Sequence, residues 1–228
     1  MQRFGRYAVF YTPPPGPFAL AGARWLGWDL AEGQAVAQPE CGVALGPITD
    51  RPRRYGFHAT LKPPFALAEG CDPADLATRL SDLAAMQAPV TVPDLTLARI
   101  GRFLALVPGA ASEVDALAAV LVTGLDPCRA PLTPEARARR RPERLTEGQR
   151  ALLDRYGYPF VLDQFRFHMT LTGPLDPAMR APVQEAAQHH FAPVLGRALR
   201  IDDVTLCGED DAGRFHAVAR FPLGVGRP

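Results

Sequence analysis

The chain has 228 residues, of which 47% are hydrophobic, and its 25 Lys and Arg nearly balance its 24 Asp and Glu. This composition is typical of a globular protein, and the near-zero net charge argues against a long nucleic-acid track, which needs a basic surplus. No segment is long and apolar enough to span a bilayer, and residues 1–6 lead into a strand-like run rather than a signal peptide. The cysteines are scattered without a CxxC pair, which favours free thiols, and we therefore expect a cytoplasmic protein.

The first predicted elements are a strand over residues 6–12, which ends at three prolines, and a helix over residues 18–28. Alternate strand residues share a face, so Tyr7 and Tyr11 point the same way. They are candidate substrate-binding residues that could wall a cleft or stack on a base or sugar. Core packing is the alternative.

Residues 33–52 are expected to form a loop. Three arginines follow closely, Arg51, Arg53 and Arg54, near enough to the next motif to bind a phosphate. Because Pro52 among them indicates a loop, we interpret these arginines as solvated.

A short pattern occurs twice, as FHATL at residues 57–61 and as FHMTL at residues 167–171. In a strand, His58 and Thr60 would point to one side and their apolar neighbours to the other. The same holds for His168 and Thr170. Two such strands side by side would place two imidazoles and two hydroxyls around one small anion, an arrangement that suits acid–base chemistry on a phosphate ester.

The two copies of the pattern begin similar stretches of sequence. Each is followed by a predicted helix, over residues 73–86 and 177–191, and then by a predicted hairpin. The separation from His58 to Thr96 is 96 − 58 = 38 residues, and from His168 to Thr205 it is 205 − 168 = 37. We interpret this as a strand–helix–hairpin unit present twice, over about residues 50–125 and about 160–222, within a single two-lobed domain of residues 1–228.

Residues 126–158 connect the two units and are predicted to be helical. They contain a run of arginines interleaved with glutamates. A mixed run of this kind usually forms a solvated helix face, which is the interpretation we favour. A segment that grips phosphate is the alternative. The arginines are Arg129, Arg137, Arg139, Arg140, Arg141 and Arg144.

Period-two spacing extends the polar faces of the two motif strands. Lys62 would share the face of His58 and Thr60, and Arg166 and Thr172 would share that of His168 and Thr170. These three are candidate substrate-binding residues, because a cation there could neutralise phosphate charge. A solvated Lys62 at the end of its strand is the alternative.

The remaining histidines, His189, His190 and His216, are interpreted as structural or surface residues. Adjacent helix residues such as His189 and His190 point in different directions, and no HxH, HExxH or Cys cluster supplies further ligands. The sequence therefore predicts no metal and no cofactor.

Several longer stretches resemble the 2H phosphoesterase superfamily, and more narrowly a 2H-like family associated with bacterial phosphonate-utilisation operons. The stretches are RYAVFYTPPPG, WLGWD, RYGFHATLKPPF, DPCRAPLTPE, GYPF and FRFHMTLTGPL. The resemblance implies an α+β, two-lobed, pseudo-two-fold fold with antiparallel sheets around a central cleft and helices outside. It also implies a metal-independent phosphodiesterase in which His58, Thr60, His168 and Thr170 occupy the motif positions.

The chemistry follows from the residue types. Opening a cyclic phosphate needs an activated water on one side and a protonated leaving oxygen on the other, and two imidazoles can supply both near neutral pH. Either histidine can be the acid and the other the base, while Thr60 and Thr170 hydrogen-bond the non-bridging oxygens.

We expect a hydrolase acting on a small cyclic phosphate ester, such as a ribose cyclic phosphate of phosphonate metabolism. The alternatives are an RNA-end 2′,3′-cyclic phosphate or 2′-5′ phosphodiesterase, and a protein that binds a phosphorylated ligand without turnover. A small phosphorylated substrate is the expected partner in each case. Neither long nucleic acid nor a membrane is expected, and no oligomeric state is predicted.

Overall fold

A seven-stranded antiparallel sheet runs through the structure, a computed structural model that describes residues 4–109, 113–196 and 198–224. Its strand order is β11-β10-β1-β4-β8-β7-β6, and two smaller sheets pair β2 with β3 and β5 with β9. The strands are β1 (Arg6–Tyr11), β2 (Trp28–Asp29), β3 (Gln34–Ala35), β4 (Ala59–Phe65), β5 (Val90–Val92), β6 (Leu95–Ile100), β7 (Phe103–Pro108), β8 (Met169–Thr170), β9 (Leu199–Ile201), β10 (Asp203–Glu209) and β11 (Phe215–Pro222). The ends of the predicted 1–228 span lie outside the described residues.

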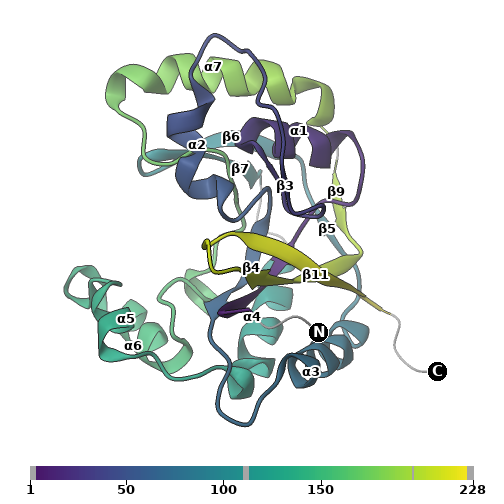
Figure 1. The fold of residues 1–228 in the computed structure, drawn as a ribbon, viewed down its shortest axis with the longest axis vertical. Coiled ribbons are helices and arrows are strands. Elements are labelled where there is room, and N and C mark those ends of the chain that lie inside the picture. The colour runs from purple at the N-terminus through teal and green to yellow at the C-terminus, as the bar shows by residue number, and fades with distance from the viewer. Residues whose placement is uncertain (1–3, 110–112, 197, 225–228) are drawn as a thin grey trace.

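The helices lie in two groups on either side of the strands (Figure 1). α1, α2 and α7 lie at one end, and α3, α4, α5 and α6 lie at the other. This mixed architecture with antiparallel sheets confirms the predicted α+β class. The helices are α1 (Pro17–Leu26), α2 (Leu45–Arg53), α3 (Pro73–Ala85), α4 (Val114–Gly124), α5 (Pro134–Ala138), α6 (Glu147–Tyr156) and α7 (Arg180–Phe191).

The two motif strands meet in the middle of the sheet. β4 and β8 pair antiparallel, with Ala59 opposite Met169, the central residues of the two His-x-Thr patterns. In an antiparallel pair this register sets the histidine of each pattern near the threonine of the other. β8 is only two residues long, shorter than the strand that the sequence predicts.

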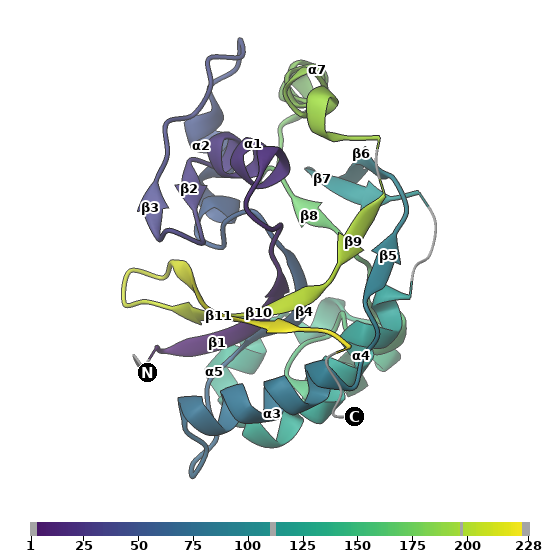
Figure 2. The same cartoon turned by 90° about the vertical axis from the view of Figure 1, so that its right-hand side faces the viewer.

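Each hairpin lies on the side of the other predicted unit's motif strand, one directly beside it and one separated from it by β1. The β6–β7 hairpin, which follows the first motif, pairs with β8. The β10–β11 hairpin, which follows the second motif, pairs with β1, which in turn pairs with β4. β5 and β9, which precede the two hairpins, pair with each other (Figure 2). The units are thus interleaved rather than joined end to end.

The apolar faces of both motifs are buried, as predicted. The apolar residues that alternate with the histidine and threonine of each motif belong to one core cluster: Phe57, Ala59, Leu61, Phe167, Met169 and Leu171. α3 packs against this core through Leu76, Leu80 and Ala84, spaced four residues apart on one helix face. Asp72 closes the first turn of α3 with a capping box, because its side chain accepts from the backbone N–H groups of Ala74 and Asp75.

The expectation of a loop over residues 33–52 is wrong near its start, where β3 forms, and at its end, where α2 forms. Pro52 lies in the last turn of α2 and leaves the carbonyl of Ile48 without its usual partner. That carbonyl instead accepts a hydrogen bond of 2.6 Å from the backbone N–H of Gly173. A contact from the second motif segment therefore satisfies a group that the proline leaves open, which local sequence signals do not report.

Candidate active site

A cavity of about 350 Å³ lies where the two motif strands meet, and His58, Thr60, His168 and Thr170 all line it. Its volume is near the lower end of the roughly 300–1,000 Å³ that is typical of small-molecule sites. The structure thus brings together the four residues that the sequence singles out. Both histidines lie directly before their strands, at the point where β4 and β8 begin.

The ring of His58 is oriented by two hydrogen bonds. Its Nδ1 lies 2.9 Å from the carbonyl oxygen of Gly56, and its Nε2 lies 3.0 Å from Oγ1 of Thr60. A carbonyl only accepts, so Nδ1 carries the proton and Nε2 is left as an acceptor. Gly56 has φ +69°, and a Cβ there would collide with Leu30, so this turn requires glycine to place its carbonyl.

His168 repeats this arrangement in the second motif. Its Nδ1 lies 2.7 Å from the carbonyl oxygen of Arg166, again two residues before the histidine. The ring centroid of Phe103 on β7 lies 5.9 Å from that of His168. Both imidazoles are therefore held by the same local contact through Nδ1, and Nε2 of His58 in addition accepts from the hydroxyl of Thr60.

Burial lowers the pKa of His58 to about 4, well below the ordinary value near 6.5. The ring of Phe10 lies with its centroid 3.9 Å from that of His58, and the ring of Tyr55 stacks at 5.9 Å. The hydrogen bond to Gly56 opposes the shift, and positive charge on His168 adds to it. His58 is therefore neutral at pH 7, the protonation state of a general base.

Of the candidate substrate-binding residues, Thr172 lines the motif cavity and Lys62 does not. Thr172 lines the cavity, but its Oγ1 accepts from the N–H of Leu104 at 3.0 Å and donates to a neighbouring carbonyl. The pairing of β1 with β4 is irregular between Thr60 and Lys62, so the period-two rule fails there. Lys62 is buried and its Nζ donates to the carbonyl of Val122 at 3.0 Å, away from the motif cavity.

The other candidate substrate-binding residues do not line this cavity. The guanidinium of Arg166 donates to the backbone carbonyls of Asp163 and Phe165. Tyr7 and Tyr11 share a face, as predicted, but that face is in the core. Phe10, on the opposite face of β1, is the residue of that strand that contacts His58.

Several cavity residues were missed or set aside in the sequence analysis. Tyr55 is the aromatic residue three positions before His58, a position that both motifs share. Arg51 lies in α2 rather than in a loop and is exposed as predicted, and Arg140 belongs to the mixed charge run. Tyr158 lies in the GYPF stretch. Arg6 and Phe103 carried no sequence signal for this site.

Of the remaining histidines, His189 is exposed, whereas His190 and His216 have structural contacts. Nε2 of His190 lies 2.9 Å from the carbonyl of Ala21, and Nε2 of His216 lies 2.7 Å from a carboxylate oxygen of Asp210. Within residues 4–109, 113–196 and 198–224, no three His, Cys, Asp or Glu side chains cluster as metal ligands would. In the same part of the chain, no helix has the length and apolarity needed to cross a bilayer.

A family model described as a protein of unknown function, DUF1045, matches residues 60–216, which include the second motif and begin at Thr60 of the first. The chain belongs to the DUF1045 family. In this DUF1045 chain, His168 lies inside the matched region and His58 lies two residues before its start.

A curated relative from Janthinobacterium sp. (strain Marseille), named ribose 1,5-bisphosphate phosphokinase PhnN, is 38% identical over 218 residues. The alignment covers 91% of the DUF1045 chain and 48% of the relative. The chain therefore spans about half the length of this relative.

Solved structures resemble the DUF1045 chain in fold. The crystal structure of TT0787 of Thermus thermophilus superposes with a TM-score of 0.50 and 16% identity, covering 98% of this chain and 100% of that chain. E. coli LigT, solved in complex with 3′-AMP, aligns with a TM-score of 0.47 and 17% identity over 97% of this chain and 99% of that one. The likeness to TT0787 shows that the sheet and its flanking helices follow a known arrangement.

Proposed function

We propose that this protein is a 2H-type phosphodiesterase that opens a small cyclic phosphate ester without a metal ion. The observation that carries the proposal is the pairing of Ala59 with Met169, which brings both His-x-Thr motifs to one cavity. Each imidazole donates from Nδ1 to the carbonyl two residues before it, so Nε2 is the nitrogen of each ring that we assign to proton transfer.

The proposed step uses the two histidines in opposite roles. Nε2 of neutral His58 takes a proton from a water molecule, and the water oxygen forms a bond to phosphorus. The bond from phosphorus to one ring oxygen breaks, and that oxygen takes a proton from charged His168. In the structure the hydroxyl of Thr60 donates to Nε2 of His58, so it has to turn from this nitrogen as the water molecule replaces it. The hydroxyls of Thr60 and Thr170 then donate to the non-bridging oxygens, where negative charge gathers in the transition state.

A phosphorylated ribose is the substrate class that we favour. The sequence resembles a family linked to phosphonate-utilisation operons, and the name of the Janthinobacterium relative specifies a ribose with two phosphates. The cavity of about 350 Å³ would admit a molecule of that class, and Arg51 and Arg140 on its wall would attract its charge.

The kinase activity in the relative's name is not carried over. A P-loop kinase needs a GxxxxGK[ST] sequence whose lysine reaches the transferred phosphates. The only lysine of this chain is Lys62, which lies in LKPPF on β4 and is bonded to Val122. The second candidate is action on RNA ends, which the aromatic rings of Tyr55, Phe103 and Tyr158 in the cavity favour because bases could stack on them.

The test is turnover by EDTA-treated protein on ribose cyclic phosphates, 2′,3′-cyclic nucleotides and short 2′-5′ oligonucleotides, with the His168→Asn variant as control. Turnover of the sugar phosphates by wild-type protein, and not by the His168→Asn variant, supports the proposal. Preference for nucleotides or oligonucleotides moves the function to RNA ends. Equal rates for wild-type and variant protein, or loss of activity in EDTA, would overturn it.

A further inference from the structure

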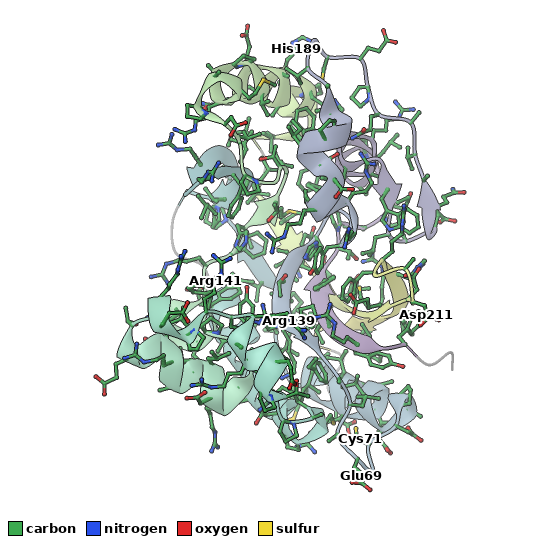
Figure 3. The ribbon with its side chains drawn as sticks, turned by 60° about the vertical axis from the view of Figure 1, so that its left-hand side comes forward. Glu69, Cys71, Arg139, Arg141, His189 and Asp211 are labelled. Carbon is green, nitrogen blue, oxygen red and sulfur yellow. The ribbon has the colours of Figure 1, made fainter. Side chains whose placement is uncertain are left out.

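A second cavity, of about 650 Å³, adjoins the motif cavity and shares part of its wall. Arg51, Tyr55, Arg140 and Tyr158 line both cavities, so a ligand of modest length could occupy the two at once. The far wall of the second cavity comes from the segment between the two units. In Figure 3, Arg139 lies where this helical segment meets the strands.

The second cavity is lined by cations, and no carboxylate is among its described lining residues. This is a local concentration, because the net charge of the chain is only +1. The cationic lining residues are Arg6, Arg51, Lys62, Arg129, Arg139 and Arg140.

Two of these cations are neutralised by partners outside the cavity wall. Arg6 pairs with Glu209 at 2.5 Å and Arg129 with Asp126 at 2.8 Å. Within residues 4–109, 113–196 and 198–224, neither Arg139 nor Arg140 has a carboxylate within ion-pair distance. Glu135, four residues before Arg139, interacts with its charge without forming an ion pair, so the guanidinium groups of Arg139 and Arg140 can still pair with a ligand.

Arg51 is a further arginine of this wall without a carboxylate partner among the described residues. Arg140 lies over the ring of Tyr158, with its guanidinium carbon 4.8 Å from the ring centroid. This contact holds the Arg140 guanidinium at the boundary between the cavities and leaves its N–H groups free to donate. The buried ammonium of Lys62 adds a fixed positive charge to the wall.

We infer that the second cavity binds a phosphomonoester carried by the same substrate whose cyclic phosphate lies between His58 and His168. The inference rests on the proposed function and narrows its substrate class to sugar or nucleoside cyclic phosphates that bear another phosphate. An arginine fork matches the paired oxygens of a phosphate, and a dianion is the ligand that a wall with several free guanidinium groups favours. An uncharged extension would leave these groups unpaired.

The experiment compares two matched substrates, adenosine 2′,3′-cyclic phosphate with and without a 5′-phosphate, and the corresponding pair of ribose 1,2-cyclic phosphates. We expect wild-type protein to have a higher kcat/KM for the member with the extra phosphate. In the variants Arg139→Gln and Arg140→Gln the ratio of the two kcat/KM values should fall by about 10- to 100-fold, as expected for a lost hydrogen bond to a charged group. Arg144→Gln, in the same segment but outside both cavities, should keep the wild-type ratio.

Equal kcat/KM for both members of each pair, with turnover intact, would overturn this inference and leave the proposed function standing. The opposite case is a second cavity that binds phosphate in a protein without the proposed activity. Calorimetric measurement of ribose 5-phosphate binding to the His168→Asn variant tests that case. Wild-type protein could turn over neither substrate and still bind ribose 5-phosphate, with weaker binding after Arg139→Gln. The proposed function would then fail, but the phosphate site in the second cavity would stand. Absence of such binding would remove the site.

Discussion

The environment of His58 favours its neutral imidazole, the form that the proposed general base must have. The ring lies against Phe10 and Tyr55 and donates to a carbonyl that Gly56 presents. Loss of hydration disfavours the imidazolium ion, and positive charge on His168 disfavours it further. The same contacts that fix the ring therefore fix its protonation state.

The pH dependence of kcat/KM tests this assignment. His58 accepts a proton only when neutral, and its pKa of about 4 lies below the ordinary value. We therefore expect kcat/KM to be maintained as the pH falls through 6.5 and to decline only as it approaches about 4. An acid limb near pH 6.5 or above in steady-state rates would show that an imidazole of ordinary pKa is the base.

Lys62 is a buried ammonium whose pKa burial lowers to about 8, from an ordinary value near 10.4. Because the pKa of Lys62 is lower in the folded protein, the unfolded chain binds more protons between pH 8 and 10.4. The stability that Lys62 contributes is therefore fully present above pH 10.4 and is lost as the pH falls to 8. Relative to Lys62→Met, wild-type protein should gain on the order of 3 kcal/mol of unfolding free energy from pH 7.5 to 10.5. Urea unfolding of both proteins at the two pH values measures their unfolding free energies. If the difference between wild-type protein and Lys62→Met is the same at both pH values, the lowered pKa of Lys62 is contradicted.

α1 supports the first motif through a close contact at Gly22. A Cβ at this position would overlap the ring of Phe57, the residue directly before His58. Gly22 is buried in the helix, so the glycine is kept by packing and not by backbone conformation. The helix and the motif are thus held together at van der Waals distance.

Gly22→Ala should lower the free energy of unfolding by about 1–3 kcal/mol, as overpacking of a core does. Gly148→Ala is the matched control, because this glycine in α6 faces open space and alanine favours a helix. The control should be as stable as wild-type protein or up to about 1 kcal/mol more stable. Urea unfolding compares them, and equal stability of the two variants would refute the contact.

Strand and helix periodicity predicted most of the elements that position the site. The alternation in FHATL and FHMTL gave the correct apolar faces, and the helix predicted over residues 73–86 forms as α3. The failures occurred where distant contacts override local signals. α2 includes Pro52 because Gly173 satisfies the open carbonyl of Ile48, and Lys62 departs from period two because the β1–β4 pairing is irregular.

Over the full chain, the interleaved order of strands explains why the candidate site was only partly predictable. The four motif residues came from a repeated pattern, and the structure places the two copies of that pattern side by side, because Ala59 pairs with Met169. The arginines of the cavity walls come from β1, from α2 and from the segment between the two motifs, which no local pattern connects. Their meeting depends on the fold and not on spacing.

The most direct test of two-histidine catalysis is the kcat for ring opening of a cyclic phosphate, in EDTA, by the His58→Asn and His168→Asn variants and by the double variant. We expect each single variant to lose roughly 10²- to 10⁴-fold, as general acid–base groups contribute. The double variant should lose much less than the product of the two, because the histidines act as a unit. A single variant with wild-type kcat, while circular dichroism shows an intact fold, would contradict the account.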